Sequence, residues 1–116
     1  MLSKEEILNE LPNFTGTESY YRHIKILYTD GVAYICSSCD AFWLLDIVES
    51  YQYHPVVSKE EFQTYKLTTR PDKTAIVEIG DGNRIIFRQE IEYSDFPLET
   101  IDYWFENGIC YLPSER

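Results

Sequence analysis

The chain has 116 residues, enough for one domain. Hydrophobic residues make up 44% and charged residues 26%, a composition typical of a packed globular protein and unlike that of a disordered or collagen-like chain. Twenty acidic against ten basic residues give a net charge of −10. This charge argues against direct binding to nucleic acid or to an anionic membrane, because both need an excess of cations.

The N-terminal segment lacks the apolar stretch of a secretion signal, and no window approaches the roughly 18 apolar residues of a membrane span. The three cysteines, Cys36, Cys39 and Cys110, are an odd and small number, unlike the disulfide framework of a secreted domain. We therefore expect one cytoplasmic domain, 1–116, with reduced thiols.

The first half of the chain, about 1–61, is expected to be helical. Ser3 and Glu6 form a capping-box pattern in front of a short amphipathic helix that ends before Pro12. The segment 20–28 fits a strand by alternation and a helix by apolar spacing, so both remain open. The segment 30–39 is expected to be a helix, although Asp30 and Gly31 could instead form the turn of a hairpin.

Two further helical segments are expected before the pattern changes. Asp40 should cap the central core helix over 41–52, where apolar residues crowd one side. Within that helix, Trp43 is expected to be buried. Ser58 with Glu61 repeats the capping-box pattern and predicts a single helical turn.

The second half, about 62–116, changes to the alternation typical of strands. Turn residues divide it into five predicted strands, 62–69, 74–79, 84–93, 101–106 and 109–112. This spacing favours an antiparallel meander. The predicted fold is therefore α+β, with N-terminal helices packed on one face of a C-terminal antiparallel meander of about five strands.

The distribution of charge marks one face of this sheet. The 27 residues from Gln89 to Glu115 contain seven acidic residues and no lysine or arginine. Alternation places the polar residues of the 101–106 strand opposite its apolar ones, so that a tryptophan lies among carboxylates. A solvated sheet face explains this pattern equally well; as an interaction surface it would have an aromatic anchor and a charged rim. The predicted acidic face consists of Glu90, Glu92, Asp102, Trp104 and Glu106.

A second candidate site lies near the N-terminus. Tyr21, Arg22 and His23 bring together a phenol, a fixed cation and a titratable imidazole, a set that suits anion binding or acid/base chemistry. Asp30 or Asp46 would orient His23 in such a site. Structural hydrogen bonding to loop groups is the competing interpretation of the same residues.

The cysteines are also considered as metal ligands. Cys36 and Cys39 have the spacing of half a zinc site, but completing it would need Cys110 and either His23 or His54 from distant segments. Buried small thiols are the favoured interpretation. We expect no metal and no other cofactor.

Several motifs along nearly the whole chain resemble an uncharacterised domain-of-unknown-function family of bacteria, plasmids and phages. The motifs are Phe-Thr-Gly-Thr-Glu at 14–18, Tyr-Tyr-Arg-His at 20–23, Tyr-Thr-Asp-Gly-Val at 28–32, Trp-Leu-Leu-Asp-Ile at 43–47, Asp-Phe-Pro-Leu at 95–98 and Leu-Pro-Ser-Glu at 112–115. The resemblance implies the company of mobile genetic elements and assigns no activity, cofactor or partner.

Three functions from different classes follow from these features. The favoured one is a non-enzymatic, acidic interaction or inhibitor protein of mobile-element origin, whose acidic face binds a basic surface of a host protein and competes there with nucleic acid. The first alternative is a small enzyme or ligand-binding domain centred on Tyr21, Arg22 and His23, with Asp46. The second is a homo-oligomeric structural domain.

Overall fold

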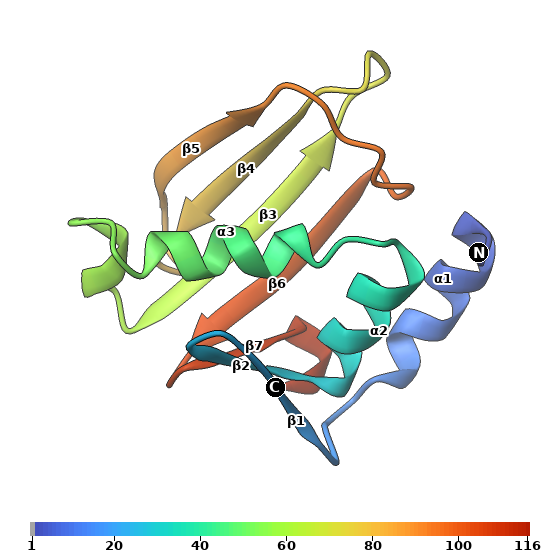
Figure 1. Ribbon diagram of the computed structural model, residues 1–116, viewed down its shortest axis with the longest axis horizontal. Coiled ribbons are helices and arrows are strands. Elements are labelled where there is room, and N and C mark those ends of the chain that lie inside the picture. Colours follow the sequence, from blue (N-terminus) through green and yellow to red (C-terminus); the bar gives the residue numbers. More distant parts are fainter. Residues whose placement is uncertain (1) are drawn as a thin grey trace.

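A seven-stranded mixed sheet with helices packed against it forms the fold in the computed structural model, which describes residues 2–116 (Figure 1). The expected α+β class is confirmed. The helices are α1 (Lys4–Glu10), α2 (Asp30–Ser38) and α3 (Trp43–Tyr51). The strands are β1 (Tyr20–His23), β2 (Ile26–Thr29), β3 (Phe62–Thr69), β4 (Ala75–Gly80), β5 (Ile85–Ile91), β6 (Thr100–Glu106) and β7 (Ile109–Tyr111). Short 3₁₀ turns occupy Leu11–Asn13, Val57–Lys59 and Pro113–Glu115.

The sheet differs from the predicted antiparallel meander of about five strands. Its strand order is β1-β2-β7-β6-β3-β4-β5, and β2 pairs with β7 in parallel while the other neighbours are antiparallel. Two of the strands come from the segment 20–28, which is a hairpin, so the first half is not helical throughout. Strand β6 pairs with β3 instead of β5, because the segment 92–99 crosses one end of the sheet and buries Phe96 and Leu98 there.

The helix boundaries follow the capping residues, with two corrections. Ser3 and Glu6 form the predicted capping box at α1, and Thr29 caps α2. Asp40 does not cap α3: it adopts a left-handed backbone with a φ of 49° between α2 and α3, a conformation that aspartate tolerates. Ser58 does not cap the turn expected after it, because that turn is formed by Val57–Lys59.

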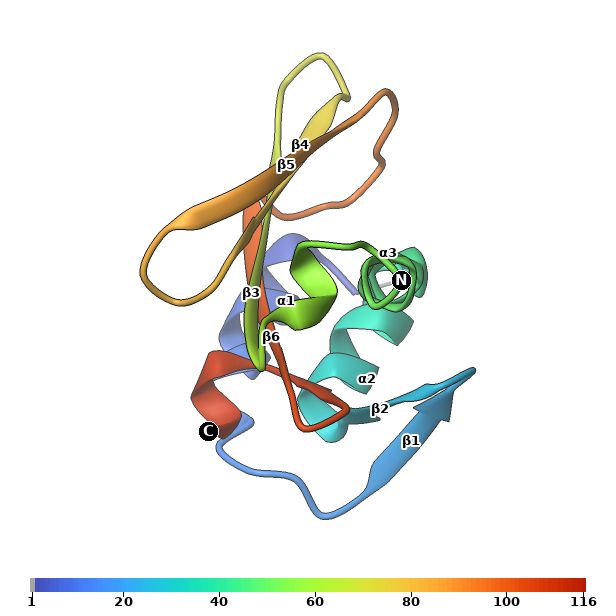
Figure 2. The ribbon, with the colours of Figure 1, turned by 90° about the vertical axis from the view of Figure 1, so that its left-hand side faces the viewer.

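Helices α2 and α3 lie on one side of strands β3 and β6 (Figure 2). The alternation predicted for β6 is confirmed, since Ile101, Tyr103 and Phe105 are buried. Trp43 is only half-buried, in contrast to the expectation, and meets Phe96 edge to face at 6.2 Å. We call the side of strands β3, β6 and β7 that faces away from α2 and α3 the open face. No helix among residues 2–116 is both long and apolar enough to cross a membrane.

Two stacked tyrosines in the core differ in how their hydroxyls are satisfied. The rings of Tyr65 and Tyr103 lie 5.3 Å apart and nearly parallel on adjacent strands. The Tyr65 hydroxyl donates to Oε1 of Gln63 at 2.7 Å and accepts from Nε2 of Gln52 at 3.3 Å. The Tyr103 hydroxyl is buried without a hydrogen-bond partner among the described residues. A buried hydroxyl without a partner costs free energy that a phenyl ring avoids.

We therefore expect Tyr103→Phe to leave the free energy of unfolding unchanged or to raise it, and Tyr65→Phe to lower it by about 1 kcal/mol. Urea denaturation of both variants measures the difference. Each variant removes one hydroxyl from the same pair of stacked rings, so each serves as the control for the other. Equal destabilisation of the two variants would contradict this assignment.

Candidate functional site

An aromatic cluster occupies the open face where β3, β6 and β7 meet. The rings of Phe62 and Trp104 are 5.3 Å apart at 76°, and Tyr111 meets the other side of Trp104 at 6.1 Å and 86°. Strand pairing aligns these residues, because Trp104 is the register partner of Tyr111 and Phe62 is that of Glu106. Trp104 is half-buried, as Trp43 is, and lies on the side of β6 away from the core that the alternation predicted.

The side chain of Arg116 packs onto this cluster. Its guanidinium carbon lies 4.8 Å from the ring centre of Phe62 and 5.6 Å from that of Trp104. One guanidinium nitrogen is 3.7 Å from the Oε1 atom of Glu106. We call the space bounded by Phe62, Trp104 and Glu106 the arginine slot. Neither Phe62 nor Arg116 was predicted to belong to this site, because Phe62 lies on another strand, 42 positions before Trp104, and Arg116 follows the last strand.

Glu106 also accepts a hydrogen bond from the hydroxyl of Tyr111 at 2.9 Å. Burial and this hydrogen bond raise the pKa of Tyr111 to about 12, so its hydroxyl remains a donor at physiological pH. The Glu106 carboxylate is thus oriented by Tyr111 while it faces Arg116.

The predicted acidic face is divided by cations from neighbouring strands. Glu90 forms a bidentate pair with Arg70, with nitrogen–oxygen distances of 3.0 and 3.1 Å. Asp102 lies beside Lys66 across the strands. Glu92 follows the end of β5, which β4 and β3 separate from β6. The five predicted residues therefore form two groups at different places in the sheet, and only Asp102, Trp104 and Glu106 are contiguous.

The excess of acidic residues is larger in the first half of the chain. Residues 1–61 contain ten acidic and four basic residues, whereas residues 62–116 contain ten and six. The additional cations of the second half include Lys66, Arg70 and Arg88, and Arg88 pairs with Glu78 at 3.0 Å. A cation-free stretch of sequence is therefore not a cation-free surface, because strand pairing sets Lys66 of β3 beside Asp102, and Arg70 pairs with Glu90.

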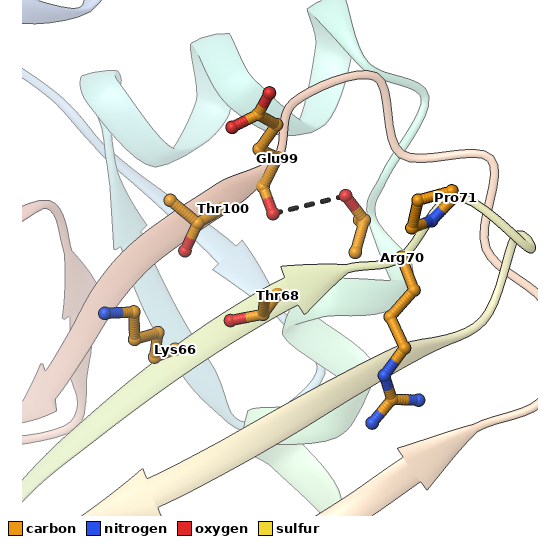
Figure 3. Close-up of a pocket in the computed structure, with 7 residues that line it drawn as sticks. Lys66, Thr68, Arg70, Pro71, Glu99 and Thr100 are labelled. Carbon is orange, nitrogen blue, oxygen red and sulfur yellow. Dashed lines mark hydrogen bonds between the residues drawn. The ribbon is translucent and has the colours of Figure 1, made fainter.

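A hollow of about 580 Å³ lies on the sheet near Lys66, Arg70 and Thr100 (Figure 3). The two cations do not converge on it, since Arg70 is held by Glu90 and by the Thr74 hydroxyl. In Figure 3 the ends of the Lys66 and Arg70 side chains point in different directions. The hollow therefore lacks the converging donors of an anion site.

The second predicted site is brought together only in part. His23 Nε2 lies 2.8 Å from the Oδ1 atom of Asp46, the orienting carboxylate that the sequence offered for it. Tyr21 donates its hydroxyl to Asp30 at 2.9 Å, and this hydrogen bond is the main cause that raises the pKa of Tyr21. Because neighbouring residues of a strand point to opposite sides, Arg22 lies on the other side of β1 from both.

The β1–β2 hairpin is fastened to α3 by two carboxylates on one face of that helix. Besides the contact of Asp46 with His23, Glu49 Oε1 accepts the backbone N–H of Lys25 at 2.6 Å. Glu49 is buried, and its second oxygen has no hydrogen-bond partner in the described chain. The hairpin tip includes Ile24, which is exposed and has a φ of 46°, an unusual conformation for a β-branched residue. These contacts hold the tip of the hairpin against α3.

We expect Glu49→Ala to accelerate amide hydrogen exchange in β1 and the hairpin tip by roughly tenfold, because a hydrogen bond to a charged acceptor contributes about 1.5 kcal/mol. Exchange in β3 and β4 should not change. Ser50→Ala, an exposed substitution on the same helix, is the matched control. Unchanged exchange in the hairpin of Glu49→Ala would show that this carboxylate does not hold it.

The three cysteines are free and buried. Burial raises the pKa of Cys36 to about 12 and that of Cys39 to about 11, and it also raises the pKa of Cys110. Among residues 2–116 no three His, Cys, Asp or Glu side chains are grouped closely enough to hold a metal ion. His54 instead accepts the backbone N–H groups of Val56 and Val57.

We expect none of the three thiols to react with a thiol-specific disulfide reagent in the folded protein at pH 8. The thiolate is the reactive form, and a raised pKa leaves almost none of it at that pH. The absorbance of the thiol that the reagent releases measures the reaction. We expect no released thiol in buffer and three equivalents per chain in denaturant. Fast reaction of one thiol in buffer would contradict the buried assignment.

Comparison with known proteins places the chain in a family but assigns no activity to it. No curated protein and no solved structure matches the chain. The model of one family, DUF6876, a family of unknown function, matches residues 5–116. This match covers every strand and all of the helices except the first residue of α1, and it agrees with the resemblance to a domain-of-unknown-function family. The chain therefore belongs to the DUF6876 family of unknown function.

Proposed function

We propose that this protein is a non-enzymatic binding domain whose open face, around Trp104, contacts a basic surface of another protein. The observation that carries the proposal is the half-buried Trp104, which lies between two further aromatic rings on the side of β6 opposite its buried residues. Where the partner also uses this basic surface to bind nucleic acid, the protein would compete with the nucleic acid and inhibit the partner.

The composition of this face supports a protein partner. Protein interfaces are centred on aromatic residues and arginine and bordered by polar groups, and a few such residues supply most of the binding free energy. Trp104 has Asp102 and Glu106 on either side along β6. The strand is central in the sheet, with β3 and β7 as its neighbours, so these side chains are presented on a rigid support.

The net charge of −10 supports a basic partner in particular. Charge acts at a distance and accelerates the encounter with a partner of opposite sign, even where local ion pairs neutralise part of a surface. Association of this kind weakens as salt is added, because salt screens the long-range attraction. The same charge opposes self-association through this face, since Asp102 and Glu106 of two copies would approach each other.

The alternative site around Tyr21, Arg22 and His23 has weaker support. Tyr21 and His23 are each held by a carboxylate, and Arg22 lies on the opposite side of the ribbon. A set that binds one ligand would present its groups to a common space. These residues are accordingly used as a comparison in the test below.

Affinity capture from a lysate of the native host, read by mass spectrometry at low and high salt, tests the proposal. We expect a basic protein to be captured at low salt and lost at high salt. Trp104→Ala and Asp102→Lys should each abolish its capture with little change in the melting temperature. The matched controls are Tyr93→Ala, an exposed aromatic residue outside the cluster, and Glu10→Lys, an exposed carboxylate on α1.

Both controls should retain the partner, because they remove an aromatic ring or reverse a charge elsewhere on the surface. Retention of the partner by Trp104→Ala would overturn the proposal. If Arg22→Ala loses the partner or a measured activity while Asp102→Lys still captures the partner, the site around Tyr21, Arg22 and His23 becomes the better candidate. A dimer that Trp104→Ala dissociates would support the homo-oligomeric alternative instead.

A further inference from the structure

The arginine slot already contains a ligand-like group, the guanidinium of Arg116. It lies against the rings of Phe62 and Trp104, at 4.8 and 5.6 Å, and faces the carboxylate of Glu106 at 3.7 Å. Aromatic faces with a nearby carboxylate are the chemistry that recognises an organic cation. The slot therefore has the composition of a binding site whose occupant is, in this structure, part of the same chain.

We propose that the slot is a recognition site for an arginine side chain of a protein partner, and that Arg116 occupies it in competition with that arginine. This inference rests on the proposed function, which it deepens by naming the group that the open face recognises. It also assigns a role to Arg116, which restrains binding until a partner displaces it.

The geometry favours arginine over lysine. A guanidinium is planar and weakly hydrated, so it can lie against aromatic faces while its N–H groups remain directed to a carboxylate. The rings of Phe62 and Trp104 lie at 76° to each other, and the guanidinium carbon of Arg116 is 4.8 and 5.6 Å from their centres. The hydroxyl of Tyr111 donates to Oε1 of Glu106, the same oxygen that faces Arg116, and so helps to fix the position of the carboxylate.

Arg116 can leave the slot without disturbing the fold. Its side chain is 55% exposed. The preceding residue, Glu115, is anchored independently: it accepts hydrogen bonds from the Thr29 hydroxyl at 2.6 Å, the Gly31 N–H at 3.0 Å and the Leu112 N–H at 2.9 Å. Rotation of one exposed side chain is therefore enough to open the slot, and the turn Pro113–Glu115 remains in place.

The test uses Arg116→Ala, with N-acetylarginine amide as the probe and N-acetyllysine amide as the comparison. NMR titration follows the indole N–H signal of Trp104, which Trp104→Phe identifies. We expect the arginine probe to shift this signal in Arg116→Ala with a dissociation constant at least about threefold lower than in the wild type, because the competing side chain is gone. The lysine probe should bind more weakly than the arginine probe in the same variant.

Phe62→Leu in the Arg116→Ala background should remove the response, and Arg116→Lys should compete less well than the wild-type arginine. Unchanged melting temperatures show that the variants are folded. No shift of the Trp104 signal in Arg116→Ala, equal affinity for both probes, or equal affinity in wild type and Arg116→Ala would each overturn the inference.

The outcome is separable from that of the capture experiment. If the arginine probe binds the slot but Trp104→Ala still captures the partner, the slot stands and the proposed function fails. If Trp104→Ala loses the partner but the probe does not bind Arg116→Ala, the proposed function stands and the arginine assignment fails.

Discussion

The parallel pairing of β2 with β7 is the constraint on which the arrangement of both halves depends. It joins a hairpin from the first thirty residues to the last strand of the chain. Because parallel strands end at the same edge, the start of α2 after Thr29 meets the turn that follows Tyr111. Glu115 uses this proximity and accepts hydrogen bonds from Thr29 and Gly31 at the N-terminus of α2, where a carboxylate also interacts favourably with the helix dipole. A Cβ at Gly31 would lie 2.6 Å from the Glu115 carboxylate, so a side chain there would displace this carboxylate.

Local patterns in the sequence predicted the local structure well. The capping box at Ser3, the strand Phe62–Thr69 and the buried side of β6 are confirmed, because each depends on residues a few positions apart. The strand order could not be predicted in this way. Whether β6 pairs with β5 or with β3 depends on how the segment 92–99 packs at the end of the sheet. Nothing within that segment indicates that Phe96 and Leu98 are buried there.

The same distinction explains the candidate site. Alternation along β6 placed Trp104 between Asp102 and Glu106 on the face away from the core, and that placement is confirmed. The cations that accompany the acidic residues belong to other strands, so a count along the chain does not include them. Arg70 reaches Glu90 from the far end of β3, and Lys66 lies beside Asp102 only because β3 and β6 are antiparallel neighbours. Surface charge in a sheet is set by strand order as much as by sequence.

Glu115 and Arg116 are adjacent in the chain but contact different parts of the molecule. Glu115 is directed toward the junction of β2 and α2, while Arg116 is directed toward the open face. Exposed cation–π contacts contribute only about 0.5–1 kcal/mol, and an exposed ion pair contributes little more. One guanidinium therefore holds the slot weakly, and tight binding by a partner would require contacts beyond it, along β6 and its neighbours. Since the fold does not depend on Arg116, such a partner could replace its side chain while the parallel pairing of β2 with β7, and with it the support beneath the slot, stays intact.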